Sequence, residues 1–108
     1  MTEVTNAKTE VIYDLEERTA AFAEAVIDFC RKLSRNEITV PLITQLVKAA
    51  SSIAANYCEA DDAESRKDFK HKIGISKKEA RETKLFLRLI SRAVPEKSAD
   101  AGRLWAEA

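Results

Sequence analysis

The chain has 108 residues, which predicts one domain near the lower end of the size range that buries an adequate core alone. Only two glycines and two prolines are present, and the abundance of Ala, Leu, Lys, Glu and Arg predicts an all-α protein rather than a β-sandwich or barrel. Eighteen basic and eighteen acidic residues give a formal net charge of zero, which excludes nucleic-acid binding through overall charge alone.

Charge is unevenly distributed along the chain. Residues 1–30 carry seven acids against two bases, whereas residues 66–92 carry ten bases against three acids. The chain does not begin with a basic and then apolar leader, and no apolar run reaches about 18 residues, so we expect a cytoplasmic protein without a membrane partner. Cys30 and Cys58 lie among apolar residues in helical patterns and are predicted to be reduced core thiols rather than a disulfide.

Hydrophobic periodicity predicts the first two helices. Residues 1–9 are polar and aperiodic and are expected to form a loose end, after which apolar residues recur at three- and four-residue steps in a helix at 10–33. Pro41 suits the first turn of a second helix at 40–59, which Thr39 or a neighbour is expected to cap. One side of this helix, here called the small-residue face, is predicted to be a packing surface and includes Ser51, Ser52 and Ala55.

Capping and breaking residues delimit the remaining helices. Ser65 begins a capping-box pattern that predicts the start of a third helix at 66–93, and Pro95 stops this helix. A final short helix at 99–108 has few large apolar residues, among them Trp105. The four segments therefore predict a single up-down-up-down four-helix bundle whose fourth helix is short or truncated.

A helical wheel of the third helix, at roughly 100° per residue, separates a core seam from an adjacent basic stripe. The basic stripe consists of Arg66, Lys70, Lys77, Arg81, Lys84, Arg88 and Arg92. Bases repeated along one helix face predict a sequence-independent track for the phosphate groups of RNA or DNA. No aromatic residue interleaves with the stripe, so binding is expected to be directed to the backbone rather than to bases. The alternative is a solvated face paired with the acids of the first helix and of the Glu59 to Glu64 turn.

A second apolar set on the third helix points away from the core seam of the wheel. It consists of Leu85, Phe86 and Leu89. Four short helices enclose only one core, so this surplus face predicts contact with another copy of the chain. We expect it to meet the small-residue face of a neighbouring subunit in a closed ring.

Residues suited to catalysis or metal binding are scarce. His71 is the only histidine, which excludes a histidine-based triad and leaves too few ligands for a His/Cys zinc cluster. No glycine-rich loop is present to hold phosphates, and the acids after Cys58 lack the spacing of a calcium loop. A non-enzymatic protein without metal or cofactor is therefore predicted.

Spaced residues in the second and third helices carry a family resemblance. They are Gln45, Ala49, Ser52-Ile53, Asn56, Glu59, Ser65, Asp68-Phe69 and the run Lys78-Glu79-Ala80-Arg81-Glu82-Thr83. With these residues the chain resembles the four-helix-bundle family related to the protein encoded in intervening sequences of bacterial large-subunit ribosomal RNA genes. The resemblance implies an up-down bundle that assembles into a ring, typically a homopentamer. The same family includes the accessory variability determinant of diversity-generating retroelements, which implies nucleic acid and a reverse transcriptase as partners.

Four of these motif residues lie along one edge of the second helix, because they recur at intervals of three, four or seven. They are Gln45, Ser52, Asn56 and Glu59. Since buried polar groups need partners, we predict a structural polar network rather than a ligand site, with Glu59 paired to a base such as Arg81.

Two functions are compatible with these features. The first is a non-enzymatic, oligomeric scaffold that has nucleic acid as its ligand. The alternative is a protein-protein interaction module with no nucleic-acid role.

Overall fold

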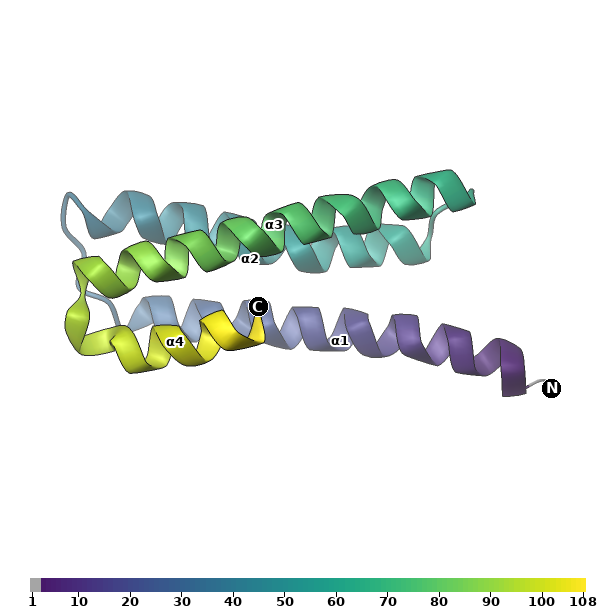
Figure 1. Cartoon of the computed structure of the whole chain (residues 1–108), viewed down its shortest axis with the longest axis horizontal. Coiled ribbons are helices and arrows are strands. Elements are labelled where there is room, and N and C mark those ends of the chain that lie inside the picture. The colour runs from purple at the N-terminus through teal and green to yellow at the C-terminus, as the bar shows by residue number, and fades with distance from the viewer. Residues whose placement is uncertain (1–2) are drawn as a thin grey trace.

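The computed structural model describes the backbone of residues 3–108 and the side chains of residues 14–108. Its elements are α1 (Glu3–Arg31), α2 (Thr39–Asp61), α3 (Arg66–Ala93), the 3-10 helix η1 (Pro95–Lys97) and α4 (Ser98–Glu107) (Figure 1). No strand occurs among the described residues. The predicted all-α four-helix bundle with a short fourth helix is confirmed, since α4 has 10 residues against 28 in α3. Over the same residues, no helix combines the length and apolar character needed to cross a bilayer.

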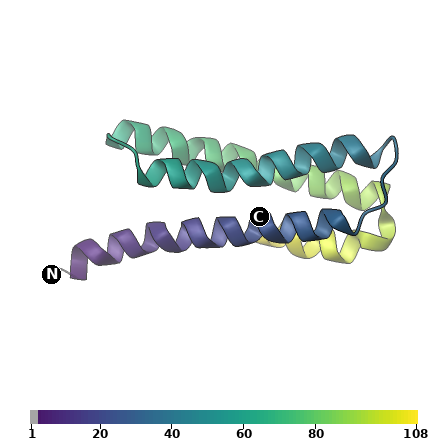
Figure 2. The same ribbon diagram turned by 180° about the vertical axis from the view of Figure 1, so that it is seen from behind.

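Each helix runs antiparallel to the next, so that the chain passes up and down the bundle (Figures 1 and 2). α2 packs against α1 and α3, and α4 packs against α3 and α1. α1 and α3 lie diagonally opposite each other over their described residues. The bundle is elongated, with extents of 53 × 23 × 17 Å. Because α4 is short, the C-terminus lies near the middle of the bundle, beside α1 (Figure 1).

The core is most completely buried where all four helices run together. Val26, Leu46, Leu87 and Ile90 are at most 1 % exposed, and Leu104 of α4 closes the fourth side. Burial of each large side chain of this kind stabilises the fold by about 1.5–3 kcal/mol. Toward the connection between α2 and α3 only three helices are present, and apolar side chains there are less well covered. Leu15, Phe69 and Ile73 are half-buried in this part.

Side chains in the connection between α1 and α2 replace missing helix hydrogen bonds. Asn36 Oδ1 accepts hydrogen bonds from the backbone N–H groups of Ile38 and Thr39 at 2.8 and 2.9 Å. Thr39 Oγ1 donates to the Ser34 carbonyl at 2.7 Å and accepts from the Asn36 N–H at 2.9 Å. Asn36, which lies three residues before Thr39, therefore satisfies two N–H groups at the start of α2, whereas Ile38, directly before the helix, makes no side-chain cap.

Local interactions also set the ends of α3. Ser65 Oγ accepts a hydrogen bond from the Asp68 N–H at 3.0 Å, which is the interaction expected of the capping pattern. At the other end the Val94 N–H donates to the Ile90 carbonyl at 2.7 Å, and Pro95, which has no N–H, begins η1. η1 then turns the chain into α4.

Several helix boundaries differ from the sequence prediction. α1 begins at Glu3, so the predicted loose end is wrong for residues 3–9; the first two residues lie outside the described part of the chain. Apolar periodicity reports packing, whereas a helix also propagates through unpacked residues of high helical propensity such as Glu, Ala and Lys. α1 ends at Arg31, α2 continues to Asp61, and α4 begins one residue early, at Ser98.

Both cysteines are free, but only Cys30 lies in the core. Burial raises the pKa of Cys30 to about 11. Cys58 is exposed, so the predicted core position is wrong: it lies on the edge of α2 toward α1, outside the seam that contains Leu46. A hydrogen bond to the Glu16 carboxylate raises the pKa of the Cys58 thiol.

Candidate nucleic-acid interface

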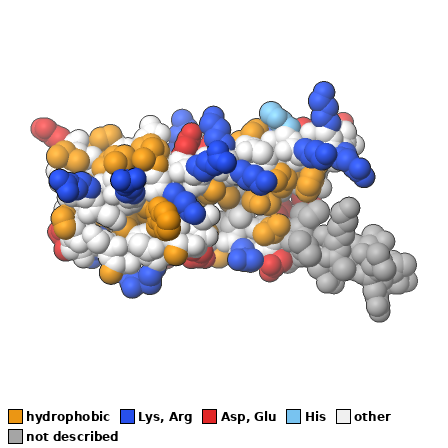
Figure 3. Space-filling model, in the orientation of Figure 1, with side chains coloured by type: hydrophobic (Ala, Val, Ile, Leu, Met, Phe, Trp, Pro, Cys, Tyr) orange, Lys and Arg blue, Asp and Glu red, His pale blue; other side chains and the backbone are white. Residues whose placement is uncertain are grey.

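The basic stripe is accessible along the whole of α3. Six of its side chains are exposed, and Lys84 is half-buried beside α4. At a rise of 1.5 Å per residue, the stripe extends about 39 Å from Arg66 to Arg92. Figure 3 shows Lys and Arg side chains gathered over the part of the molecule that α3 occupies in Figure 1. The stripe thus forms a long basic surface on a neutral protein.

Acids do not pair with the basic stripe within the part of the chain whose side chains are described. The ion pairs there are Arg18–Asp14, Lys72–Glu59 and Arg103–Asp100, and none includes a stripe residue. The alternative prediction, in which the acids of α1 and of the Glu59 to Glu64 turn pair with the stripe, therefore finds no support among residues 14–108. The charge of the stripe is left for solvent ions or for a ligand.

Near its C-terminal end the stripe meets an aromatic residue from α4. Lys84 Nζ lies 4.7 Å from the centroid of the Trp105 ring, which is a cation–π distance. Arg88 and Trp105 line one groove between α3 and α4. This part of the stripe therefore combines cations with an exposed aromatic ring.

The position of Trp105 beside the stripe was not predicted, although the sequence contains a signal for it. α3 and α4 are antiparallel neighbours joined around Pro95, so residues at equal distances from this turn lie at the same level of the bundle. Lys84 precedes the turn by about as many residues as Trp105 follows it. These equal distances from the turn bring the ring of Trp105 beside Lys84.

Beyond the end of α4 the stripe borders a second hollow, with a volume of about 280 Å³. Apolar side chains from α1, α2 and α3 form most of its walls, and they include Leu15, Phe22, Ile53, Tyr57 and Ala80. Arg18, Lys77 and Glu107 also line it. Across residues 14–108, no three His, Cys, Asp or Glu side chains lie close enough together to hold a metal ion. The hollow is therefore a largely apolar depression with two bases and one acid among its lining residues.

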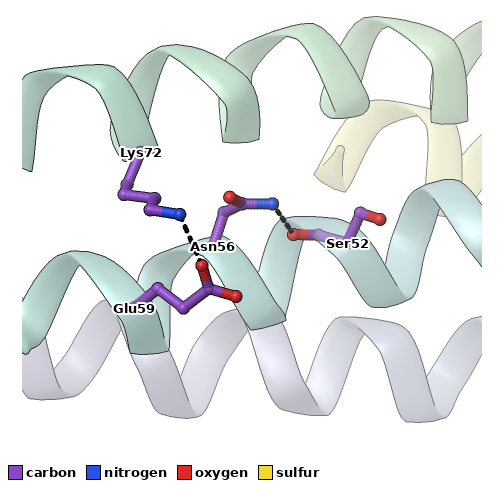
Figure 4. A network of polar contacts seen from close by, with 4 residues as sticks. All are labelled: Ser52, Asn56, Glu59 and Lys72. Carbon is purple, nitrogen blue, oxygen red and sulfur yellow. Dashed lines mark hydrogen bonds and ion pairs between the residues drawn. The ribbon is translucent and has the colours of Figure 1, made fainter. Parts of the chain in front are cut away.

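Three of the four residues in the predicted polar network lie together where α2 faces α3 (Figure 4). Asn56 Nδ2 donates to the Ser52 carbonyl at 2.8 Å, which is a bond within α2. Lys72 Nζ of α3 donates to Glu59 Oε1 at 2.6 Å, and this bond raises the pKa of Lys72. A single exposed ion pair therefore joins this cluster to α3.

Two details of the network differ from the prediction. Gln45 is exposed, and no hydrogen bond joins it to the other three residues among the described side chains. Glu59 pairs with Lys72 rather than Arg81, because Arg81 lies more than two turns further along α3 and is exposed on another face. A more buried contact between the two helices comes from Ser76, whose Oγ donates to the Ile53 carbonyl at 3.2 Å.

The residues predicted for a subunit interface lie on two accessible faces, with one exception. Leu85 and Leu89 are 49 % and 39 % exposed on α3. Phe86 is partly buried and packs against the core, so the expectation that it points away from the seam is wrong. Phe86 lies about 100° around α3 from the buried Leu87, and its long side chain leans back to reach the core. The small-residue face of α2 is accessible, with Ser51 and Ala55 exposed and Ser52 half-buried.

Comparison with known proteins identifies the family of the chain. Residues 13–101 match the family described as 23S rRNA-intervening sequence protein. No curated protein and no solved structure matches the chain. The family match covers all of α2 and α3, which carry the spaced motif residues and the basic stripe. The resemblance found in the sequence is thereby confirmed, and the chain belongs to the 23S rRNA-intervening sequence protein family.

Proposed function

We propose that the chain is a non-enzymatic scaffold of the cytoplasm that assembles into a ring of identical subunits and binds the phosphate groups of RNA or DNA through the basic stripe. The observation that carries this proposal is the set of seven bases along one side of α3, none of which pairs with an acid among the described side chains.

Phosphate binding by the stripe needs no net positive charge on the whole protein. Many of the acids lie elsewhere in the sequence, with seven of them in residues 1–30, so the local potential along α3 depends mainly on its own bases. Each base that contacts a phosphate releases a condensed counterion, and the logarithm of the affinity then falls with the logarithm of the salt concentration by about 0.9 per contacted phosphate on duplex DNA. Strong salt dependence is therefore the expected signature of binding.

Exposed apolar residues support the proposed ring. Leu85 and Leu89 lie near the stripe on the outer side of α3, and a partner would remove them from water. We assign the small-residue face of α2 to the opposite side of this contact, because small side chains allow a neighbouring helix to approach closely. Such a head-to-tail contact joins two different faces and closes into a ring if the rotation per subunit divides a full turn. A count of five copies comes from the family resemblance alone.

A gel-shift series with single- and double-stranded RNA and DNA at graded salt tests the ligand. We expect shifted complexes at low salt that dissociate as salt is added, without preference for sequence. Absence of any shift near about 50 mM salt, where phosphate contacts are strong, would exclude nucleic acid as the ligand.

Light scattering tests the ring. We expect a mass that is a multiple of the 12.1 kDa chain, and a change to monomer when Leu85→Asp and Leu89→Asp are combined. Ile38→Asp combined with Val40→Asp is the matched control, since both residues are also large and apolar, 66 % and 45 % exposed, but lie where α2 begins. Phe86→Asp is unsuitable for this test because it would place a charge against the core. A monomeric parent protein at micromolar concentration would contradict the assembly.

The second candidate function is a protein-protein interaction module, and the exposed pair Leu85 and Leu89 is the observation that favours it. In that case the pair would bind a different protein, and no nucleic acid would shift in the gel. The resemblance to the accessory variability determinant makes a reverse transcriptase a proposed partner under either function. Co-purification of such an enzyme with the parent but not with the doubly substituted variant would support this partner.

A further inference from the structure

The groove between α3 and α4 is distinct from the hollow beyond the end of α4. It has a volume of about 390 Å³ and is lined by Leu87, Arg88, Ser91, Ala101, Gly102 and Trp105. This volume falls within the range of roughly 300–1,000 Å³ found for small-ligand sites. Leu87 and Ala101 are each 1 % exposed and supply an apolar floor, whereas Arg88, Gly102 and Trp105 reach solvent. The groove therefore offers an apolar surface beside a cation.

Trp105 is held at the edge of this groove without being needed for the core. It is 47 % exposed, while Ala101 and Leu104 already bury the inner side of α4. Lys84 Nζ, 4.7 Å from the ring centroid, covers one face of the ring and restricts its orientation. The ring is therefore partly exposed at the edge of the groove, where a planar partner could contact it.

The charges around the groove match an anionic ligand. Lys84 and Arg88 belong to the basic stripe, and no acid pairs with them among the described side chains. Arg103 of α4, in contrast, is paired with Asp100. A nucleotide combines a planar base with an anionic phosphate, so an exposed indole ring beside unpaired cations suits both of its parts.

The wall of the groove on α4 has open space at Gly102. A Cβ atom added there would meet no heavy atom within 4 Å. Gly102 precedes Trp105 by three residues and lies on the same side of α4, where a larger side chain would occupy the space next to the indole ring. The absence of a side chain at this position thus keeps the groove open.

We propose that this groove binds an unpaired base of a single-stranded nucleic acid, stacked on Trp105, with a neighbouring phosphate held by Arg88. The proposal rests on the proposed function and narrows it, because the bases of a duplex are already paired and stacked. It also revises the expectation of purely backbone-directed binding, which considered only the residues of α3. The other stripe bases then hold phosphates on either side of the stacked base.

Fluorescence of Trp105 reports directly on this site, since it is the only tryptophan in the chain. The parent protein is titrated with an oligo(dT) strand and an oligo(U) strand of roughly 12 nucleotides, with a duplex of equal length, and with thymidine monophosphate. Anisotropy of a dye on each strand reports binding independently. We expect both single strands to quench the fluorescence to saturation, whereas the duplex binds with little quenching and the mononucleotide needs a far higher concentration.

Two variants separate the ring from the charges. Trp105→Leu removes the aromatic surface and is expected to weaken binding of single strands by roughly 5- to 100-fold, with duplex affinity unchanged. Gly102→Leu keeps the ring and every charge but fills the groove, and should weaken single-strand binding while raising helix propensity. Ala20→Leu is its control, because Ala20 is exposed on α1 and therefore lies outside both the groove and the basic stripe. Circular dichroism verifies that each variant is folded.

The outcomes distinguish this inference from the proposed function. Absence of binding to every strand would overturn the proposed function and the base site together. Binding of single strands and duplex with equal affinity, unchanged fluorescence and no effect of Trp105→Leu or Gly102→Leu would overturn the base site and leave phosphate binding by the stripe intact. Quenching by the mononucleotide at the same concentration as by the strands would also overturn it, since the groove would then be a free-nucleotide site.

Discussion

The two halves of the bundle differ in the number of helices that enclose the core. In the half that contains η1, α4 closes the fourth side, and Val26, Leu46 and Ile90 are fully buried. In the half that contains the α2–α3 connection, three helices leave Leu15 and Ile73 half-buried. The 10 residues of α4 span about 15 Å, against about 42 Å for the 28 residues of α3. The length of α4 therefore decides where the core is complete, whereas the basic stripe runs along both halves.

Truncation of an isoleucine of α3 in each half of the bundle measures this difference in packing most directly. Ile90→Ala is expected to lower the free energy of unfolding by about 2–5 kcal/mol, because Ile90 is 0 % exposed and its removal leaves a cavity. Ile73→Ala should lower the free energy of unfolding by only about 1 kcal/mol, since Ile73 is half-buried where the bundle has three helices. Urea denaturation followed by circular dichroism gives both values. Equal losses would show that the two halves are equally well packed.

The reaction rates of the two cysteine thiols provide a second comparison of the two halves. Cys58 is exposed, whereas Cys30 is buried in the four-helix half, so Cys58 should react with a disulfide reagent at least about tenfold faster at pH 8. Glu16→Gln should accelerate the reaction of Cys58 further, because the Glu16 carboxylate raises the pKa of this thiol and so reduces its thiolate fraction. Mass spectrometry identifies which cysteine is labelled. Labelling of Cys30 first would contradict the burial described for α1.

The helix caps at the two ends of the bundle should differ by a smaller amount. Asn36→Ala removes a side chain that accepts two backbone hydrogen bonds at the start of α2, and we expect a loss of about 1–2 kcal/mol in the free energy of unfolding. Ser65→Ala removes one such bond at the start of α3, and the expected loss is about 0.5–1 kcal/mol. Urea denaturation provides the comparison. A larger effect of Ser65→Ala would mean that the three-helix end contributes more to stability than its packing indicates.

The smallest expected effect concerns Glu79, which lies where α3 faces α2. Burial, followed by a hydrogen bond with Glu82 and repulsion from it, raises the pKa of Glu79 above its ordinary value of 4.5. Because the pKa of Glu79 is higher in the folded state than in the unfolded state, ionised Glu79 lowers stability at neutral pH. This loss of stability decreases as the pH falls through the folded-state pKa, and it is absent below the unfolded-state pKa. Glu79→Gln should therefore raise the Tm slightly at pH 7.

The pH dependence of that gain provides the control. It should disappear below pH 4.5, where Glu79 is protonated in both states. Glu24→Gln, on the exposed surface of α1, removes the same charge and should change the Tm less at pH 7. Thermal unfolding at both pH values decides the matter, and a gain that persists at low pH would assign the effect to packing rather than to charge.

Much of the fold follows from local signals in the sequence. α3 begins after the Ser65 cap and ends before Pro95, and both signals act within a few residues of the boundary. The start of α1 was not predictable in this way, because residues 3–9 lack the apolar period that marks a packed helix. Periodicity therefore identifies the faces of helices better than it identifies their ends.

The candidate site is only partly predictable for a related reason. A helical wheel of α3 places the basic stripe on one side of that helix. It cannot show that Trp105, which belongs to α4, contacts Lys84. It also places Phe86 too far from the seam, because a long side chain can lean back toward the core. Contacts between helices depend on topology and side-chain direction, which a single-helix projection leaves out.

The salt dependence of binding is the most direct test of the basic stripe. The slope of log affinity against log salt is measured with duplex DNA for the parent, for Lys70→Gln combined with Lys77→Gln, and for Arg31→Gln combined with Lys32→Gln as a control of equal charge at the end of α1. We predict that the slope becomes shallower by about 0.9 for each phosphate that the stripe variant no longer binds, and that the control keeps the parent slope. Identical slopes for the stripe variant and the parent, or equal changes in the variant and the control, would contradict phosphate binding by this face of α3.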